Sequence, residues 1–281
     1  SLANLPLEHA RHGKLFRSVH ARFWLQANTI LAVFLGVGVL PCMRGVGAGA
    51  SLLLASPRVR PSACWAAAAA VVGLQISLQY AECDKSQEWA IWEAGHATLM
   101  AVPRNGLLLV KGDLNTNAVR YLMECEGARP DVQQLDLSHV SYTWFNRRHA
   151  RAWHSNVTLP GRRFTRLHRQ PPAGAYLLRH LLRANIRRKP IVITSGLESL
   201  DPEIFTEFVL WPSGVGYRVY PRLQPPAPRA WLRDNALRLP ILPSDFVASS
   251  AESGLWEDIA NRDAAIAHAQ VASHMLVVPP D

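Results

Sequence analysis

Two uncharged apolar segments near the start of the chain place the strongest constraint on what it can fold into. Phe23–Leu40 and Ala63–Tyr80 contain no charged residue, and each approaches the ~20 apolar residues that cross a hydrocarbon core. We therefore expect two membrane helices with a connecting loop at 23–80, preceded by an N-terminal flank at 1–22. A buried core helix is the alternative interpretation of each segment.

The charges beside these segments predict which side of a membrane the rest of the chain occupies. The connecting loop carries Arg44, Arg58 and Arg60, whereas "AECDKSQEWAIWE" after the second segment is acidic. Positive charge favours the cytosolic side, so we expect the C-terminal portion outside the cell or in a lumen. The N-terminal flank is also basic, which argues against this orientation. The glycosylation sequon at Asn156 supports it.

Downstream of residue 103, apolar runs of strand type alternate with amphipathic helical patterns. This alternation predicts a mainly parallel, Rossmann-like α/β domain at 81–222. A Pro-rich linker and a helix from about residue 254 make up 223–281. The expected strands are 106–110, 131–137, 189–196 and 214–220, and the expected helices are 117–127, 175–186 and 201–208.

Polar residues follow the first expected strand, where α/β sheets bind ligands. Gly112 permits close backbone approach, Asp113 can accept hydrogen bonds from sugar hydroxyls, and Asn115 and Asn117 lie at the start of the next helix. The same residue types also form tight turns with local side-chain caps, and this alternative stays open. The sequence contains no GxGxxG or Walker pattern, so a dinucleotide or P-loop site is not predicted.

The net charge of +9 invites the hypothesis of a nucleic-acid partner. The basic clusters "NRRHAR" and "RRFTRLHR" lack interleaved aromatic residues, however. We therefore interpret the charge as Arg-rich compositional bias and expect no nucleic acid.

The chain has four cysteines and eleven histidines, which are the residue types of disulfides and metal sites. A Cys83–Cys125 disulfide is an option if the domain is luminal, and two free thiols are the alternative. His149 and His154 lack a third ligand nearby, so no metal is predicted.

A longer block, "GDLNTNAVRYLMECEGARPDVQQLDLSHVSYTWF", resembles the transmembrane protein 260 family of endoplasmic-reticulum protein O-mannosyltransferases. "RFWLQANTILAVFLGVG", "RRKPIVITSG", "WPSGVGYRV" and "GLWEDIANRDAAIAHAQVASHML" are also similar to that family. The resemblance covers most of the chain from about Arg22 onward. In the central block it rests on Gly112, Asp113, Asn117, Arg120, Tyr121, Cys125, Glu126, Arg129, Pro130, Asp131, Val132, Tyr142 and Trp144.

The resemblance implies transfer of mannose from a dolichol-phosphate-mannose-type donor to Ser or Thr of a protein acceptor. It implies an endoplasmic-reticulum membrane location with the C-terminal domain in the lumen, and it makes the bilayer and a protein acceptor the expected partners. The acidic catalytic loop of the family is not found in these residues. We therefore expect a C-terminal fragment of such an enzyme, with no cofactor in this chain and no catalytic residue assigned.

Two other functions are compatible with the sequence. One is a membrane-anchored luminal α/β module that binds or supports but catalyses nothing. The other is a soluble nucleotide-binding α/β enzyme.

Overall fold

The chain divides into two compact units, Ser1–Glu88 and Trp89–Asp281. The predicted domain boundaries at 23–80, 81–222 and 223–281 are not tested by this division and stay predictions. The computed structural model describes residues 30, 31, 34, 61–84, 86, 89–149, 152, 154, 156–166, 171–236, 238–239 and 256–278.

Helix α2 (Pro61–Cys83) belongs to the first unit and covers the second uncharged segment. Five successive alanines, 66–70, supply only methyl groups, and Gln75, Ser77 and Gln79 add polar side chains. Of the helices in the described part of the chain, none combines the length and apolarity that a bilayer crossing requires. The prediction of two N-terminal transmembrane helices is therefore wrong. Most of Phe23–Leu40 lies outside the described residues.

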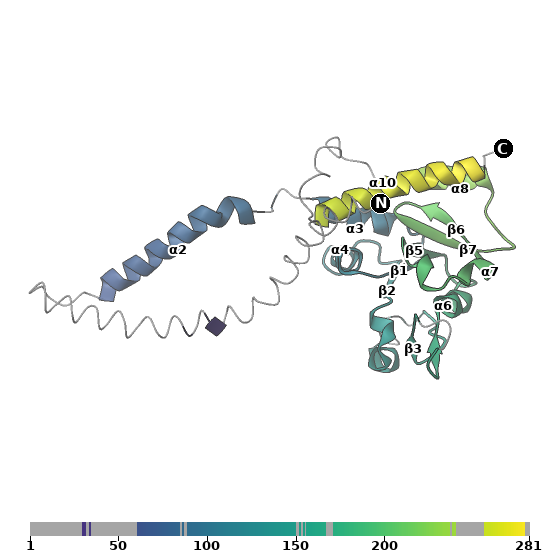
Figure 1. Ribbon diagram of the computed structural model, residues 1–281, viewed down its shortest axis with the longest axis horizontal. Helices are drawn as coiled ribbons and strands as arrows, with labels where there is room; N and C mark the ends of the chain where they lie inside the picture. Colours follow the sequence, from purple (N-terminus) through teal and green to yellow (C-terminus); the bar gives the residue numbers. More distant parts are fainter. Residues whose placement is uncertain are drawn as a thin grey trace, which may run out of the picture. The chain divides into compact units, whose positions relative to one another are not determined.

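The second unit is built on a five-stranded sheet with the order β2-β1-β5-β7-β6 (Figure 1). β1 pairs in parallel with β2 and β5, whereas β7 runs antiparallel to β5 and β6 antiparallel to β7. The α/β class is thus correct, but the sheet is mixed rather than mainly parallel. The strands are β1 (Leu107–Val110), β2 (Gln133–Asp136), β5 (Ile191–Thr194), β6 (Phe208–Ser213) and β7 (Gly216–Pro221).

The mixed topology arises because β6 and β7 form an antiparallel hairpin at the edge of the sheet. Trp211–Ser213 completes β6, and the pair Ser213↔Gly216 closes a two-residue hairpin turn onto β7. Gly214 in that turn has φ 57°, a conformation that favours glycine in tight hairpins. Pro212 lies within the strand, which is tolerated because β6 is at the edge of the sheet.

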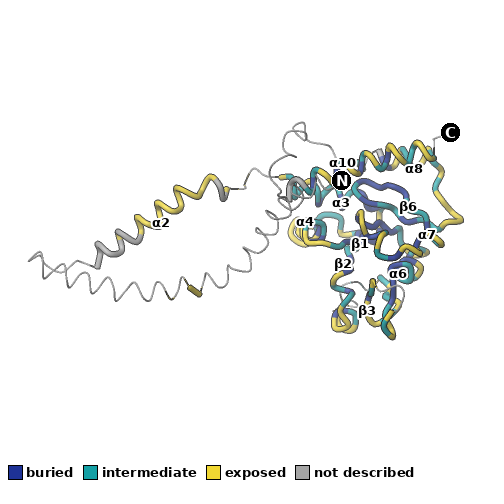
Figure 2. The backbone as a smooth tube through the Cα atoms, in the orientation of Figure 1, coloured by how far each residue is buried: buried dark blue, intermediate teal, exposed yellow. Residues whose placement is uncertain are grey.

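Strand β1 is buried on both faces, and Figure 2 shows the sheet at the buried centre of this unit. Leu107 and Leu109 join an apolar cluster that includes Leu181 of α6 (Leu178–Asn185). Leu108 and Val110 join a second cluster on the other side, with residues of α3 (Ala90–Met100) and α4 (Asp113–Glu124). A continuous apolar run is the pattern of a strand covered on both faces, which is how the sequence predicted it.

Helices α3 and α4 cover one face of the sheet and pack closely together. Gly95 of α3 is the point of closest approach, because a Cβ built there would lie 2.8 Å from the Cβ of Ala118 in α4. Helix α4 begins at Asp113, four residues before the predicted start at Asn117. Asp113, Asn115 and Asn117 are therefore helical residues rather than loop residues.

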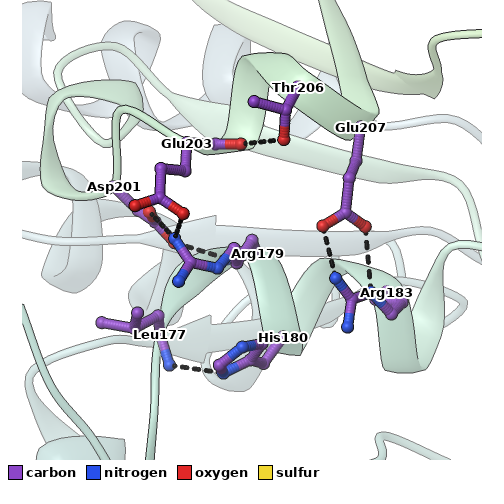
Figure 3. Close-up of polar contacts among 8 residues, drawn as sticks. All are labelled: Leu177, Arg179, His180, Arg183, Asp201, Glu203, Thr206 and Glu207. Carbon is purple, nitrogen blue, oxygen red and sulfur yellow. Dashed lines mark hydrogen bonds and ion pairs between the residues drawn. The ribbon is translucent and has the colours of Figure 1, made fainter. Parts of the chain in front are cut away.

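On the other face, α6 is joined to α7 (Ile204–Glu207) by charged hydrogen bonds (Figure 3). The carboxylate of Asp201, only 1% exposed, accepts from the Arg179 backbone N–H at 3.0 Å and from its guanidinium at 2.9 Å. Glu203, which is exposed, also pairs with Arg179 at 2.7 Å. Arg183 and Glu207 form a two-pronged pair nearby.

The C-terminal helices α8 (Pro228–Ala236) and α10 (Trp256–Val277) pack beside β6 through a small aromatic cluster. Trp211 and Trp231 lie 5.4 Å apart, and the His274 ring is 4.6 Å from the first and 4.7 Å from the second. The helix predicted from about residue 254 is confirmed. On this helix Ala264, Ala267 and Val271 are buried, whereas Ile259 is half-buried.

Two further features complete the second unit. The indole N–H of Trp231 donates to the Pro212 carbonyl at 2.8 Å, at the outer edge of the sheet. Two short helical turns follow β2, namely η2 (His139–Ser141) and η3 (Phe145–His149). A separate two-stranded sheet comes next, formed by β3 (Arg163–Phe164) and β4 (Ala175–Tyr176). A third helical turn, η4 (Glu198–Leu200), follows β5.

Candidate functional site at the strand ends

A cavity of about 530 Å³ lies where the parallel strands β1 and β5 end. The chain passes from β1 to β2 on one side and later returns to β5 on the other, so the connections diverge at this point. Open α/β sheets bind ligands at such divergence points, outside the carboxyl ends of the strands. The volume lies within the range of small-molecule sites.

The walls of the cavity come from segments that are far apart in the sequence. Helix α3 supplies one wall, α10 faces it, and the start of α4, the end of β5 and the β6–β7 turn supply the rest. Five alanines give these walls much of their surface. They are Ala90, Ala94 and Ala97 from α3, and Ala260 and Ala264 from α10.

Polar side chains interrupt this apolar lining at several points. Asn115 lines the cavity half-buried, and its side-chain amide has no hydrogen-bond partner among the described residues. Thr194, the last residue of β5, is buried and also lines the cavity. The neighbouring Ser195 hydroxyl donates to the Val215 carbonyl at 3.1 Å, which fixes the hairpin turn at the rim. A mostly apolar cavity with few fixed polar groups is typical of ligand sites.

Ionisable side chains on α3 and α10 also line the cavity. Burial raises the pKa of Asp263 above its ordinary value, although Arg262 partly opposes this. His96 faces the cavity from α3, where its ring stacks on Trp92 with 4.9 Å between centroids.

Arg238 connects this cavity to a second one at the amino ends of the strands. Its guanidinium donates to the Ala101 carbonyl at 3.2 Å, and burial lowers its pKa while the group stays charged. The second cavity, about 600 Å³, is also lined by Arg129 and Asp131.

Arg129 and Asp131, which precede β2, form a structural ion pair. Arg129 donates from Nε and Nη2 to the two carboxylate oxygens at 2.8 and 2.9 Å. It also donates to the carbonyls of Leu99, Val102 and Pro103 at the end of α3. This pairing lowers the pKa of Asp131 strongly, with the Arg129 hydrogen bond as its main cause. The donors of Arg129 are thus committed to the fold, and the strand-end cavity is the better candidate.

The structure separates the four predicted ligand residues. Asn115 lines the cavity, whereas Gly112, Asp113 and Asn117 are exposed and lie outside its lining. Gly112 precedes α4 with φ 95°, so its role there is conformational. The part of these residues in ligand binding stays a prediction.

The other predicted positions lie away from the cavity. Asn156 is exposed in a turn, and the backbone of Thr158 is held by the Asn185 side chain through two 2.8 Å hydrogen bonds. Cys125 is a free, exposed thiol at the end of α4. The side chain of Cys83 lies outside the described residues, so the predicted disulfide is untested. Within the described residues, no three His, Cys, Asp or Glu side chains gather as metal ligands would.

Sequence reasoning missed the α3 and α10 residues of the site. The cavity is lined by two groups of polar residues that lie more than a hundred positions apart in the sequence. These are Glu93 and His96 on α3, and Asn261 and Asp263 on α10. The available signal was the run of small residues around Gly95, which marks a helix that packs closely. That signal does not reveal which helix lies opposite.

The mixed sheet with a cavity at its strand ends defines the chain's second unit as an α/β domain with one candidate site. The chain is similar in sequence to two known proteins. The chain is 31% identical over 220 residues to mouse "Protein O-mannosyl-transferase TMEM260", covering 78% of this chain and 30% of that protein. It is 30% identical over 229 residues to the Dictyostelium discoideum protein of the same name, covering 79% of this chain and 27% of that protein.

These similarities confirm the resemblance seen in the sequence: the chain belongs to the TMEM260 family. It spans less than a third of the length of the two relatives, 30% and 27%. No family model matches the chain, and no solved structure matches it.

Proposed function

We propose that this chain takes part in protein O-mannosylation, as the recognition domain of a TMEM260-type transferase. The reaction would move mannose from a lipid-linked donor of the dolichol-phosphate-mannose type to a Ser or Thr hydroxyl of a protein acceptor. The observation that carries the proposal is the similarity of about four fifths of the chain to two proteins named for this activity. No residue of the chain is assigned to bond making or bond breaking.

The strand-end cavity is the proposed recognition element. Its apolar walls suit the body of a peptide segment or the carbon face of a sugar, and Asn115 offers both a donor and an acceptor to a hydroxyl group. Thr194 and Asp263 add two more polar groups to the lining. We infer that a short hydroxyl-bearing segment of the acceptor enters here.

Two asparagines on α4 provide a matched test of this role. Asn115 lines the cavity, whereas Asn117 is exposed two positions away on the same helix. Asn115→Ala in the full-length protein is expected to raise the apparent KM for the acceptor about tenfold, because a hydrogen bond to the bound segment is lost. Asn117→Ala is expected to leave it unchanged. Transfer would be followed by mass spectrometry of the acceptor from cells that lack the natural protein.

The comparison of these two variants decides whether the acceptor binds in the cavity. Equal transfer and equal KM in both variants, with both proteins folded, would remove the cavity from the proposal. A loss in both variants would point to the outer surface of α4 instead.

A non-catalytic binding or structural module is the second candidate function. It is favoured by the lining of the cavity, in which alanine side chains outnumber charged ones. The purified chain would then bind an acceptor peptide without transferring sugar to it. Activity of this chain alone with a lipid-linked donor would eliminate this candidate.

We also propose that the domain resides in the lumen of the endoplasmic reticulum, facing the bilayer that holds the donor. The exposed turn at Asn156 supports this, since a sequon must be accessible to be modified. A glycan on Asn156 that is sensitive to endoglycosidase H is the expected result. An unmodified Asn156 in a protein with normal transfer activity would contradict it.

A further inference from the structure

The acidic and basic residues of the chain are strongly segregated. Residues 137–197 contain twelve Lys and Arg and no Asp or Glu, whereas the whole chain carries a net charge of +9. The remaining residues therefore carry a net charge of −3. Compositional bias toward Arg explains an excess of positive charge, but it does not explain why acidic residues are absent from one continuous segment.

Much of this segment folds as one substructure after β2. We use "basic lobe" for the described residues between 139 and 176, which include η2, η3, β3 and β4. η2 contacts both η3 and β3. The Asn146 side-chain amide joins the parts by donating to the carbonyls of Val140 at 3.0 Å and Arg162 at 2.9 Å. Figure 2 shows exposed backbone at the end of this lobe, around the label β3.

The arginines of the lobe differ from those of the adjoining helix α6. Arg179 and Arg183 of α6 are paired with carboxylates of the α7 region. In contrast, five exposed arginines of the lobe form no ion pair with any described residue. These are Arg147, Arg148, Arg162, Arg163 and Arg166.

Positive charges also approach one another at the base of the lobe. Burial, and after it repulsion from Arg166, lowers the pKa of Lys111. Asp136, at the end of β2, is mostly buried. Its carboxylate accepts from the Ser138 backbone N–H at 2.7 Å and lies 3.6 Å from His139. The lobe therefore keeps a positive field that is not neutralised from within.

Two exposed aromatic rings accompany these charges. Tyr142 and Trp144 are 55% and 54% exposed and stack with their centroids 6.0 Å apart. Trp144 also meets Phe145 edge to face, which anchors it to the buried part of the lobe. Trp, Tyr and Arg are the residue types most enriched in the energetic centres of protein interfaces.

We propose that the basic lobe is a docking surface for an acidic segment of a protein partner. The arginines attract and orient the acidic side chains, and the Tyr142–Trp144 pair provides the apolar contact. A protein partner is favoured because the aromatic rings are stacked on each other rather than spread as separate platforms for successive bases. The proposal does not depend on the strand-end cavity, and neither surface shares the residues that define the other.

The test measures peptide binding to the full chain by fluorescence anisotropy. The probe is a short labelled peptide of alternating Glu and Ser, with a Gln-for-Glu counterpart as its neutral control. The Arg147→Glu, Arg148→Glu double variant is expected to weaken binding of the acidic peptide by roughly tenfold or more. Binding should also weaken as salt is raised, because both partners are exposed.

A charge-matched control distinguishes the effect of the lobe arginines from the effect of a lower net charge. Arg229→Glu with Arg233→Glu on α8 makes the same change in net charge at exposed positions outside the lobe. This control is expected to change binding by less than about twofold. The Arg162→Glu, Arg163→Glu variant probes the other side of the lobe if the first variant is unstable to heat.

Several outcomes would overturn the proposal. The lobe would be excluded if its variants bound the acidic peptide as well as the natural chain does, or if the α8 control weakened binding equally. Competition arms identify the class of partner. If single-stranded RNA or phosphatidylserine vesicles displaced the peptide at lower concentration and needed the same arginines, an acidic protein segment would not be the partner.

Discussion

Gly95 of α3 and Ala118 of α4 touch so closely that no larger side chain fits at position 95. A Cβ at 95 would lie 2.8 Å from the Ala118 Cβ and 3.1 Å from its backbone carbonyl carbon. Gly95→Val is therefore expected to lower the free energy of unfolding by about 1–3 kcal/mol, the usual cost of overpacking. Urea denaturation of the two proteins would measure it.

The same contact predicts coupling between the two positions. Ala118→Gly alone should cost about 1 kcal/mol through helix propensity. Added to Gly95→Val, it should recover part of the loss, because the space vacated at 118 accepts the new side chain. Strictly additive losses would contradict direct contact between these helices.

Asp201 and Glu203 bind the same guanidinium but should contribute very differently to stability. The Asp201 side chain is 1% exposed and the Glu203 side chain 58% exposed. Asp201→Ala leaves Arg179 partly buried without its inner partner and should cost about 3 kcal/mol. Glu203→Ala should cost no more than about 1 kcal/mol. Similar denaturant midpoints for the two variants would show that burial does not decide the strength of this network.

His274 should make the stability of the second unit depend on pH. Burial lowers its pKa below the ordinary 6.5, so the folded state favours the neutral ring between Trp211 and Trp231. The unfolded chain takes up the proton first as pH falls. Stability is therefore complete above about pH 6.5 and declines as pH falls through the folded-state pKa.

Replacing the ring tests this dependence. His274→Phe keeps the aromatic contact and removes the titrating group, so urea midpoints should fall less between about pH 8 and about pH 5 than in the natural chain. Some decline should remain, since burial also lowers the pKa of His154. An unchanged pH profile in the variant would exclude His274 as a contributor.

Asp263 should have the opposite dependence. Its folded-state pKa lies above the ordinary 3.8, so its contribution to stability is present at low pH and is lost as pH rises through the folded-state value. Asp263→Asn should therefore be more stable than the natural chain at neutral pH, with the difference shrinking in acid. Asp234→Asn, at an exposed position on α8, is the control. A destabilised Asp263→Asn protein at neutral pH would show that the carboxylate has a stabilising partner.

Most strands of the sheet could be predicted from local pattern, and one could not. The runs at β1, β2, β5 and β7 are apolar or alternating, and each forms a strand close to its expected limits. β6 was missed because Pro212 argues against a strand. Only its place at the edge of the sheet makes that proline acceptable, and edge position is a property of the whole fold.

The site was harder to predict because it is assembled from distant segments. The rule that ligands bind at strand ends led to Asn115, which does line the cavity. The opposing walls come from α3 and α10, whose pairing depends on long-range packing. For α2, the absence of charged residues suggested a bilayer crossing. An uncharged segment need not be strongly apolar, however, and α2 contains a run of alanines and two glutamines.

The edge residue Pro212 also affects whether another copy of this domain can add a strand to the sheet. Pro212 follows the alternation of an antiparallel hairpin closed at Ser213↔Gly216, so its nitrogen and carbonyl point away from β7. The nitrogen carries no hydrogen, and the carbonyl already accepts from the Trp231 indole. An incoming strand would find neither a donor nor a free acceptor at this position. That edge is therefore capped against sheet extension, a common beginning of aggregation.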